Sequence, residues 1–242
     1  MPLSVDVVFT PKLLSSSRLS GKTVVVTDIL RATTTITVAL ANGACSVTPV
    51  LTPADAFHFV DSTPIALIGG EREGIKVNGF DLGNSPREYT KSVVAGRPVV
   101  LTTTNGTRTL CACRTAHRVL VGCFLNLRSV VDCLKRVPGK IVIACSGREG
   151  SFCLEDTVFA GACADALKCT AGNLKSDFQV TDAAEAARIL YHEYRRDLIG
   201  MLKMCYHGKH LTDVGLGGDL AFCAQTNVID IVPRQIDGCI IA

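Results

Sequence analysis

The strongest constraint on the fold is a set of six short apolar runs rich in β-branched residues. They lie at 5–9, 22–27, 65–70, 97–102, 118–123 and 140–145, between Gly, Pro, Lys and polar residues. Continuous apolar runs of this length are typical of strands buried on both faces, and helix-like segments separate them. The pattern predicts an α/β protein with a largely parallel sheet and crossover helices, in a three-layer α/β/α architecture.

One segment after the second run carries a clear helix signal. It begins at about Ala32 and continues through "ATTTITVALANG", where Asn42 and Gly43 supply a left-handed C-terminal cap. Threonines are poor helix formers in a helix interior, but near a helix start their hydroxyls act as caps and anion donors.

A second helical segment lies near the end of the chain. "TDAAEAARILYHEYRRDLIGMLKMC" has Asp182 and Glu185 at capping-box spacing and apolar residues at i, i+4 intervals. We interpret this segment as packing rather than chemistry. The histidines in or after it, His192, His207 and His210, are interpreted as ordinary surface or core residues.

Two pairs of segments indicate an internal duplication. "GKTVVVTDILRATTT" (21–35) and "GRPVVLTTTNGTRTL" (96–110) each combine a strand with a polar loop, and they begin 75 residues apart (96 − 21). "IALIGGEREG" (65–74) and "IVIACSGREG" (141–150) begin 76 residues apart (141 − 65). We therefore predict one domain over 1–242, built from two similar halves at about 21–95 and 96–172, followed by a helical C-terminal segment at about 181–225.

Composition and charge narrow the class of protein. The formal net charge is +3 and no run of five basic residues occurs, so we expect no nucleic-acid partner. No signal-peptide pattern and no apolar stretch of about 18 residues occurs, so we expect a cytoplasmic protein without membrane contact. The twelve cysteines form no C-x-x-C pair and are predicted to be small core residues. A homo-oligomer is left open.

Four polar loops follow predicted strands. They are "TDILRATTT" (27–35), "GGEREGIKVNGFDLGNSP" (69–86), "TTTNGTR" (102–108) and "CSGREGSFCLED" (145–156). Ligands of open α/β sheets bind beyond the carboxyl ends of strands, so we expect the four loops to converge on one cleft. They mix carboxylates with arginines, which indicates a hard divalent cation beside an anionic substrate. A Mg²⁺ ion combined with arginines that bind phosphate in a bidentate manner favours phosphoryl chemistry. For any single carboxylate, a surface salt bridge is an equally good interpretation.

The common phosphate-binding and hydrolase motifs are excluded by position. A Walker A loop ending at "GKT" would need Gly where Ser16 stands, and an Asp-x-Asp nucleophile motif would need an acid at Leu30. A cysteine phosphatase loop starting at Cys145 would need Arg where Ser151 stands, and no Gly-x-Ser-x-Gly elbow occurs.

Together, "DILRATTTI", "GGEREGIKVNGFDLGNSP", "TTTNGTR" and "CSGREGSFCLED" resemble the 2-phosphosulfolactate phosphatase family, known from coenzyme M biosynthesis. The resemblance extends from about Asp6 to Pro233, and "HGKHLTDVGLGGDLAFCAQTNVIDIVP" resembles the family's C-terminal segment. It implies a Mg²⁺-dependent hydrolysis of (R)-2-phospho-3-sulfolactate, a small anionic phosphorylated substrate, to 3-sulfolactate and phosphate. It also implies an α/β/α fold of two similar halves.

The assignment of roles within these motifs follows the loops and the resemblance. The predicted catalytic residues are Asp28, Arg31, Arg148 and Glu149. The predicted Mg²⁺ ligands are Asp28, Glu71 and Glu149, with Asp81 and Asp156 as second choices. Substrate contacts are predicted for Thr33, Thr34, Arg72, Lys76, Asn105, Thr107 and Arg108.

Several alternatives remain open. A metal-bound water and a phosphoenzyme on Asp28 are competing mechanisms. The substrate could be another small phosphorylated hydroxy acid, and a non-catalytic anion-binding protein would keep the same cleft.

Overall fold

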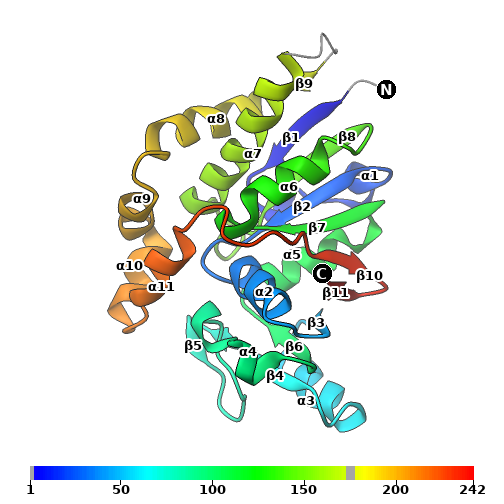
Figure 1. The fold of residues 1–242 in the computed structure, drawn as a ribbon, viewed down its shortest axis with the longest axis vertical. Helices are drawn as coiled ribbons and strands as arrows, with labels where there is room; N and C mark the ends of the chain where they lie inside the picture. The colour runs from blue at the N-terminus through cyan, green and yellow to red at the C-terminus, as the bar shows by residue number, and fades with distance from the viewer. Residues whose placement is uncertain (1–2, 173–177) are drawn as a thin grey trace.

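The chain folds around one mixed sheet with helices on its flanks (Figure 1). A computed structural model describes residues 3–172 and 178–242. Within them the sheet has eleven strands. From one edge to the other these are β5 (Ile75–Lys76), β4 (Leu67–Arg72), β6 (Pro98–Thr102), β3 (Ser46–Pro49), β11 (Cys239–Ile241), β10 (Arg234–Ile236), β7 (Arg118–Gly122), β2 (Thr23–Thr27), β8 (Lys140–Cys145), β1 (Ser4–Val8) and β9 (Gln179–Val180).

All six strands predicted from apolar runs are confirmed, each to within two residues at its start. Their pairings, β4 with β6, β2 with β7, β2 with β8 and β1 with β8, are parallel. The strands that were not predicted are short, and three of them, β5, β10 and β11, pair antiparallel. The sheet is therefore mixed rather than uniformly parallel. The α/β class is confirmed, whereas the division into two similar halves stays a prediction.

The helices connect the strands and cover the sheet (Figure 1). They are α1 (Ser16–Leu19), α2 (Ala32–Ala41), α3 (Pro53–Ser62), α4 (Lys91–Val94), α5 (Gly106–Ala112), α6 (Leu127–Leu134), α7 (Leu154–Gly172), α8 (Asp182–Tyr194), α9 (Leu198–Met204), α10 (Tyr206–Asp213) and α11 (Gly218–Cys223). Short 3₁₀ turns lie at Pro11–Leu13, Pro86–Glu88, Cys113–Thr115 and Phe124–Asn126.

Helix α2 has the predicted boundaries and is buried along most of its length. It ends at Asn42, and Gly43 takes a φ of 92°, as the predicted cap requires. The hydroxyls of its buried threonines donate to backbone carbonyls. Thr34 Oγ1 donates to Ile29 O at 2.9 Å, and Thr37 Oγ1 donates to Thr33 O at 2.8 Å. These bonds explain how a threonine-rich helix remains stable in a core.

The C-terminal helical segment differs from its prediction. The expected long helix breaks after Tyr194, and Asp197 caps the separate helix α9 by accepting from Gly200 N. Helix α8 begins with Thr181 as its N-cap, so the predicted Asp182/Glu185 capping box is wrong. Helices α9, α10 and α11 then lie together at one side of the molecule (Figure 1).

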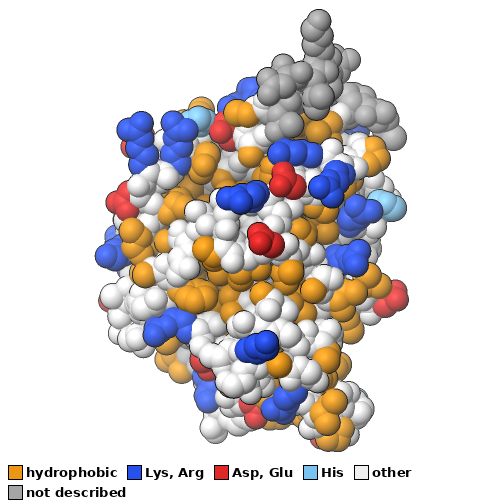
Figure 2. Space-filling model, viewed as in Figure 1, with side chains coloured by type: hydrophobic (Ala, Val, Ile, Leu, Met, Phe, Trp, Pro, Cys, Tyr) orange, Lys and Arg blue, Asp and Glu red, His pale blue; other side chains and the backbone are white. Residues whose placement is uncertain are grey.

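The core is formed mainly by the central strands. Val24, Val25 and Val26 in β2 and Ile143 in β8 are fully buried, and burying each such side chain contributes roughly 1.5–3 kcal/mol. Within the described residues, no helix combines the length and the apolar character that crossing a membrane requires. Figure 2 shows Lys and Arg side chains scattered over the viewed face rather than gathered in one patch.

Candidate active site

The loops after β2 and β8 are joined by one buried carboxylate. Asp156, at the start of α7, accepts Ile29 N on Oδ1 at 2.8 Å, and Ser146 N and Gly147 N on Oδ2 at 3.0 and 3.1 Å. Its side chain is 2% exposed. These three backbone bonds make Asp156 an anchor for the two loops. They compete with the metal role predicted for it, which stays a prediction.

Glu71 joins the loops after β4 and β6 in the same way. Its Oε1 accepts Thr104 N at 2.8 Å, and its Oε2 accepts Gly74 N at 2.8 Å. The loops after β6 and β8 are joined by Asn105, whose Oδ1 accepts Glu149 N at 2.9 Å. The four polar loops therefore meet at the carboxyl ends of their strands, as the sequence predicts.

Asp28 lies beside this meeting point, between the starts of α2 and α5. It directly follows β2 and faces the start of α2, where its Oδ1 accepts Ala32 N at 3.3 Å. Its Oδ2 makes no hydrogen bond within the described part of the chain, and Gly106 packs against that oxygen. Burial, together with the charge of Glu71, raises the pKa of Asp28 to about 7, despite the opposing Ala32 N–H.

Arg31 is the cation next to Asp28, and it is 2% exposed. Its Nη1 donates to Asp219 Oδ2 at 2.8 Å and its Nη2 donates to Gly74 O at 2.7 Å. Its Nε has no partner in the described chain. Arg31 thus connects the loop after β2 with the turn after β4 and with α11.

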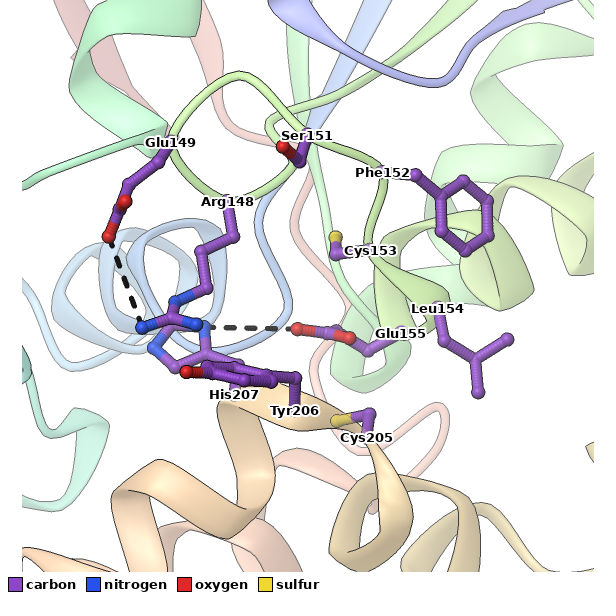
Figure 3. Close-up of a pocket in the computed structure, with 10 residues that line it drawn as sticks. All are labelled: Arg148, Glu149, Ser151, Phe152, Cys153, Leu154, Glu155, Cys205, Tyr206 and His207. Carbon is purple, nitrogen blue, oxygen red and sulfur yellow. Dashed lines mark ion pairs between the residues drawn. The ribbon is translucent and has the colours of Figure 1, made fainter.

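Two adjoining cavities form a cleft beside these loops, with volumes of about 460 and 210 Å³. Both are lined by Arg148, Glu149 and His207. The larger also has Ser151, Phe152, Cys153, Leu154, Glu155, Cys205 and Tyr206 in its wall (Figure 3). The smaller is completed by Glu71, Glu73, Gly74, Thr104, Asn105 and His210.

Arg148 is the main cation of the cleft. Its guanidinium carbon lies 4.0 Å from the ring centre of Tyr206, and Figure 3 shows the two groups stacked. Its Nη2 is 3.9 Å from Glu149 Oε1, and the side chain is 29% exposed. Within the described residues this long ion pair is the one polar contact of the guanidinium, so it keeps donors that can bind an anion.

Helix α10 contributes residues whose position the sequence interpretation missed. His207 lines both cavities, with Nδ1 3.8 Å from Glu155 Oε1. Burial, with the charges of Arg31 and Arg148, lowers its pKa to about 3, so its imidazole is neutral at neutral pH. His210 Nε2 lies 2.9 Å from Glu73 O and ties α10 to the turn after β4. The two histidines within "HGKH" were the available signal.

Asp28 and Arg31 are buried and line neither cavity. Three of the predicted substrate-binding cations also lie outside both cavities. Arg72 donates to Thr102 Oγ1 at 3.0 Å and to backbone carbonyls. Lys76 is exposed and reaches Asp81 O at 3.5 Å. Arg108 is also exposed. The structure therefore does not bring Arg72, Lys76 or Arg108 to the cleft.

The predicted threonines and Asp81 have internal partners instead. Thr33 and Thr107 are fully buried and donate to Asp28 O at 2.9 Å and Thr103 O at 3.0 Å, and Thr34 is likewise bonded to backbone. Asp81 is exposed, and its Oδ2 accepts Ile68 N at 2.8 Å, which holds the returning loop against β4. These residues shape the loops, and their predicted contacts with substrate or metal are not supported by their positions.

The donor set fits a Mg²⁺ ion that is held by few protein ligands. Asp28 offers an oxygen without a hydrogen bond, and its charged neighbours Glu71 and Glu155 oppose its ionisation, which a cation would relieve. Within residues 3–172 and 178–242, no group of three His, Cys, Asp or Glu side chains forms a ready-made metal site. Mg²⁺ commonly takes one or two carboxylates and completes its shell with water and phosphate oxygens, so Asp28 and Glu71 are the residues that would hold it.

Comparisons with known proteins agree on one family. The family model described as 2-phosphosulpholactate phosphatase matches residues 8–238. A "Probable 2-phosphosulfolactate phosphatase" of Symbiobacterium thermophilum is 40% identical over 228 residues, 93% of this chain and 96% of the relative. A protein of the same description from Clostridium acetobutylicum is 35% identical over 98% of this chain and 99% of its own length. With a match of this extent, the chain belongs to the 2-phosphosulfolactate phosphatase family.

Proposed function

We propose that the protein is a phosphoric monoester hydrolase that converts (R)-2-phospho-3-sulfolactate to 3-sulfolactate and phosphate, with Mg²⁺ as cofactor. The observation that carries the proposal is the position of Asp28. It is a buried carboxylate with one unbonded oxygen, it adjoins Arg31, and it lies where the four loops that resemble the family converge.

The arginines are the groups that bind the phosphate. Arg148 is half-exposed at the junction of the two cavities and has free donors, which suits the first contact with an incoming anion. Arg31 is buried and held from two sides, so its charge is pre-organised beside Asp28. A fixed positive charge stabilises the negative charge that spreads over the phosphoryl oxygens during transfer.

The carboxylates determine where a cation can bind. Glu71 is fixed by Thr104 N and Gly74 N, and this holds it close to Asp28. When bound at these carboxylates, Mg²⁺ supplies charge neutralisation for the phosphate. His207, neutral at physiological pH, adds no repulsion to a bound cation and no charge toward the anion.

Hydrolysis breaks the bond between phosphorus and the C2 oxygen of the substrate. The attacking group is either a water molecule or the carboxylate of Asp28, which would then carry the phosphoryl group until water releases it. Rapid acid quenching with ³²P-labelled substrate separates the two routes. Label that remains on wild-type protein and is lost in Asp28→Asn identifies the phosphoenzyme, and no retained label identifies direct attack by water.

We infer that the protein consists of two similar halves, as its paired motifs suggest. Glu73 and Glu149 stand at matching positions of the two Arg-Glu-Gly motifs, and both adopt positive φ values, 54° and 51°. The strand order is also reciprocal, with β6 of the second half between β3 and β4, and β2 of the first half between β7 and β8. Such an exchange would bring one polar loop of each half to a common cleft.

A substrate comparison tests the proposed specificity. Steady-state kcat/KM is measured for 2-phospho-3-sulfolactate and for 2-phospholactate, which lacks the sulfonate. We expect a preference of at least about tenfold for the sulfonate, equivalent to about 1.4 kcal/mol. Equal values would assign the protein to a broader class of hydroxy acid phosphates.

A further inference from the structure

Within the described chain, the carboxylate that forms a salt bridge with Arg31 comes from the C-terminal segment. Asp219 in α11 is 1% exposed, and its Oδ2 accepts Arg31 Nη1 at 2.8 Å. Its other oxygen, Oδ1, accepts the hydroxyl of Ser85 at 2.7 Å. Both oxygens of Asp219 are therefore engaged, one by the arginine and one by the loop that follows β5.

This arrangement fixes both the charge and the direction of Arg31. A buried guanidinium is stabilised when it is paired and hydrogen-bonded, and of its three nitrogens Arg31 leaves Nε without a partner in the described chain. Asp219 holds Nη1 from one side and Gly74 O holds Nη2 from the other. Because a guanidinium is planar, two fixed nitrogens determine the orientation of the whole group.

The turn that carries Gly74 is itself part of the cleft. Gly74 N donates to Glu71, and Glu73 O is bonded by His210 of α10. The C-terminal helices thus contact these loops at several points, among them His210, Asp219 and Tyr206, which stacks on Arg148. An ion pair that only stabilised the fold would not need to end on the arginine beside Asp28.

We propose that Asp219 is a positioning residue for the reaction, which holds the guanidinium of Arg31 in the orientation that binds the transferred phosphoryl group. The inference rests on the proposed function. Asp219 makes no contact with the cavities and acts through Arg31 alone. Ser85 is the support that keeps Asp219 in place.

A double-mutant cycle tests this inference. Asp219→Asn removes the charge but keeps the size of the side chain and an acceptor oxygen, so we expect the variant to fold. We expect kcat to fall about 10- to 100-fold with a smaller change in KM, since misplacing a catalytic group by about 1 Å costs this much. In the Arg31→Ala background, Asp219→Asn is expected to change kcat less than about threefold, because the group it positions is absent.

A matched control separates positioning from general stability. Asp165 pairs with Arg188 between α7 and α8, with side chains only 14% and 16% exposed. Asp165→Asn removes a comparable ion pair away from the cleft and should leave kcat unchanged at a temperature well below the unfolding midpoint. The positioning role would be overturned if the losses of kcat multiply in the double variant of Arg31 and Asp219. It would also be overturned if Asp165→Asn and Asp219→Asn lower kcat equally.

A binding measurement keeps the inference distinct from the proposed function. If wild-type protein releases no phosphate from 2-phospho-3-sulfolactate, titration calorimetry with inorganic phosphate replaces turnover. If Asp219 positions Arg31, Asp219→Asn should bind phosphate more weakly than wild type. Adding Arg31→Ala to that variant should then not lower the phosphate affinity further. Unchanged affinity in Asp219→Asn, or a wild type that binds no phosphate, contradicts the inference.

Discussion

Gly106 packs directly against the buried carboxylate of Asp28. A Cβ atom at position 106 would lie 2.6 Å from Asp28 Oδ2 and 2.4 Å from the Cβ of Ala32. The absence of a side chain therefore lets the starts of α2 and α5 approach the same oxygen. This close approach is the structural reason for the glycine in "TTTNGTR".

Gly106→Ala should consequently impair both stability and activity. Alanine favours a helix over glycine by about 1 kcal/mol, but overpacking of a buried site typically costs about 1–3 kcal/mol, so the clash outweighs the gain. We expect a lower unfolding midpoint and a loss of kcat of about tenfold or more because Asp28 must move. Chemical denaturation and phosphate-release kinetics measure both. Gly217→Ala is the control, since its Cβ would meet nothing closer than 3.3 Å, and an equal loss there would refute the argument.

Tyr206 should affect the reaction through its stack with Arg148. The guanidinium lies 4.0 Å from the ring centre, and such contacts contribute about 0.5–2 kcal/mol. Tyr206→Ala is expected to raise KM about 3- to 10-fold, whereas Tyr206→Phe, which keeps the ring face, should remain near the wild-type value. Steady-state kinetics of the two variants provide the measurement. A large effect in Tyr206→Phe would instead implicate the hydroxyl.

Replacing Asp28 should stabilise the metal-free protein while abolishing turnover. Its folded pKa of about 7 exceeds the unfolded value of 3.8, so the ionised group costs stability increasingly from about pH 4 to 7 and fully above that range. At pH 8 in EDTA, the free energy of unfolding of Asp28→Asn should therefore exceed that of wild type by about 1–3 kcal/mol, with little difference at pH 4. Urea unfolding at the two pH values measures the difference.

The same variant reports on the metal. Added MgCl₂ should raise the melting temperature of wild type and leave Asp28→Asn unchanged, because only the former retains the proposed ligand. Asp81→Asn, at an exposed carboxylate that accepts Ile68 N, should retain the magnesium response. A response in Asp28→Asn equal to that of wild type would place the ion elsewhere.

His207 should make the fold sensitive to acid. Its pKa is lowered to about 3 from 6.5, so the unfolded chain takes up the proton first and stability is lost as the pH falls from 6.5 toward 3. His207→Gln should reduce this loss by about 2 kcal/mol at pH 4 relative to pH 7. Urea unfolding at the two pH values measures the difference. Parallel pH dependences of the two proteins would show that His207 is not buried neutral.

The sequence predicted the elements whose signal is local. The runs that became β2, β6 and β8 are five or six residues long, continuously apolar between their ends and bounded by breakers, and α2 carries its own cap at Asn42. The strands that were missed, such as β3 and β10, are three or four residues long and partly exposed, so they lack a continuous apolar run. Their pairing is decided by the tertiary fold rather than by propensity.

The predicted site residues that line the cleft are polar or charged residues at the ends of the predicted strands. Four predicted site residues line the cleft because they lie at or just beyond the carboxyl end of a parallel strand; they are Glu71, Asn105, Arg148 and Glu149. Arg72 lies outside the cleft because it directly follows Glu71 in β4, and neighbouring residues in a strand point to opposite faces. Lys76 lies on the short edge strand β5, where its side chain is exposed. Asp219 and His207 were missed because helices α10 and α11 reach the site only through contacts with loops more than 50 residues away in sequence.

The most direct test of the account is phosphate release from 2-phospho-3-sulfolactate by wild-type protein and by Asp28→Asn, each in the presence of MgCl₂ and of EDTA. The account predicts sustained release by wild type with Mg²⁺, a loss of at least about a hundredfold in EDTA, and a similar loss in Asp28→Asn that Mg²⁺ does not restore. Release that is equal in EDTA, or near-normal turnover in Asp28→Asn, would contradict it.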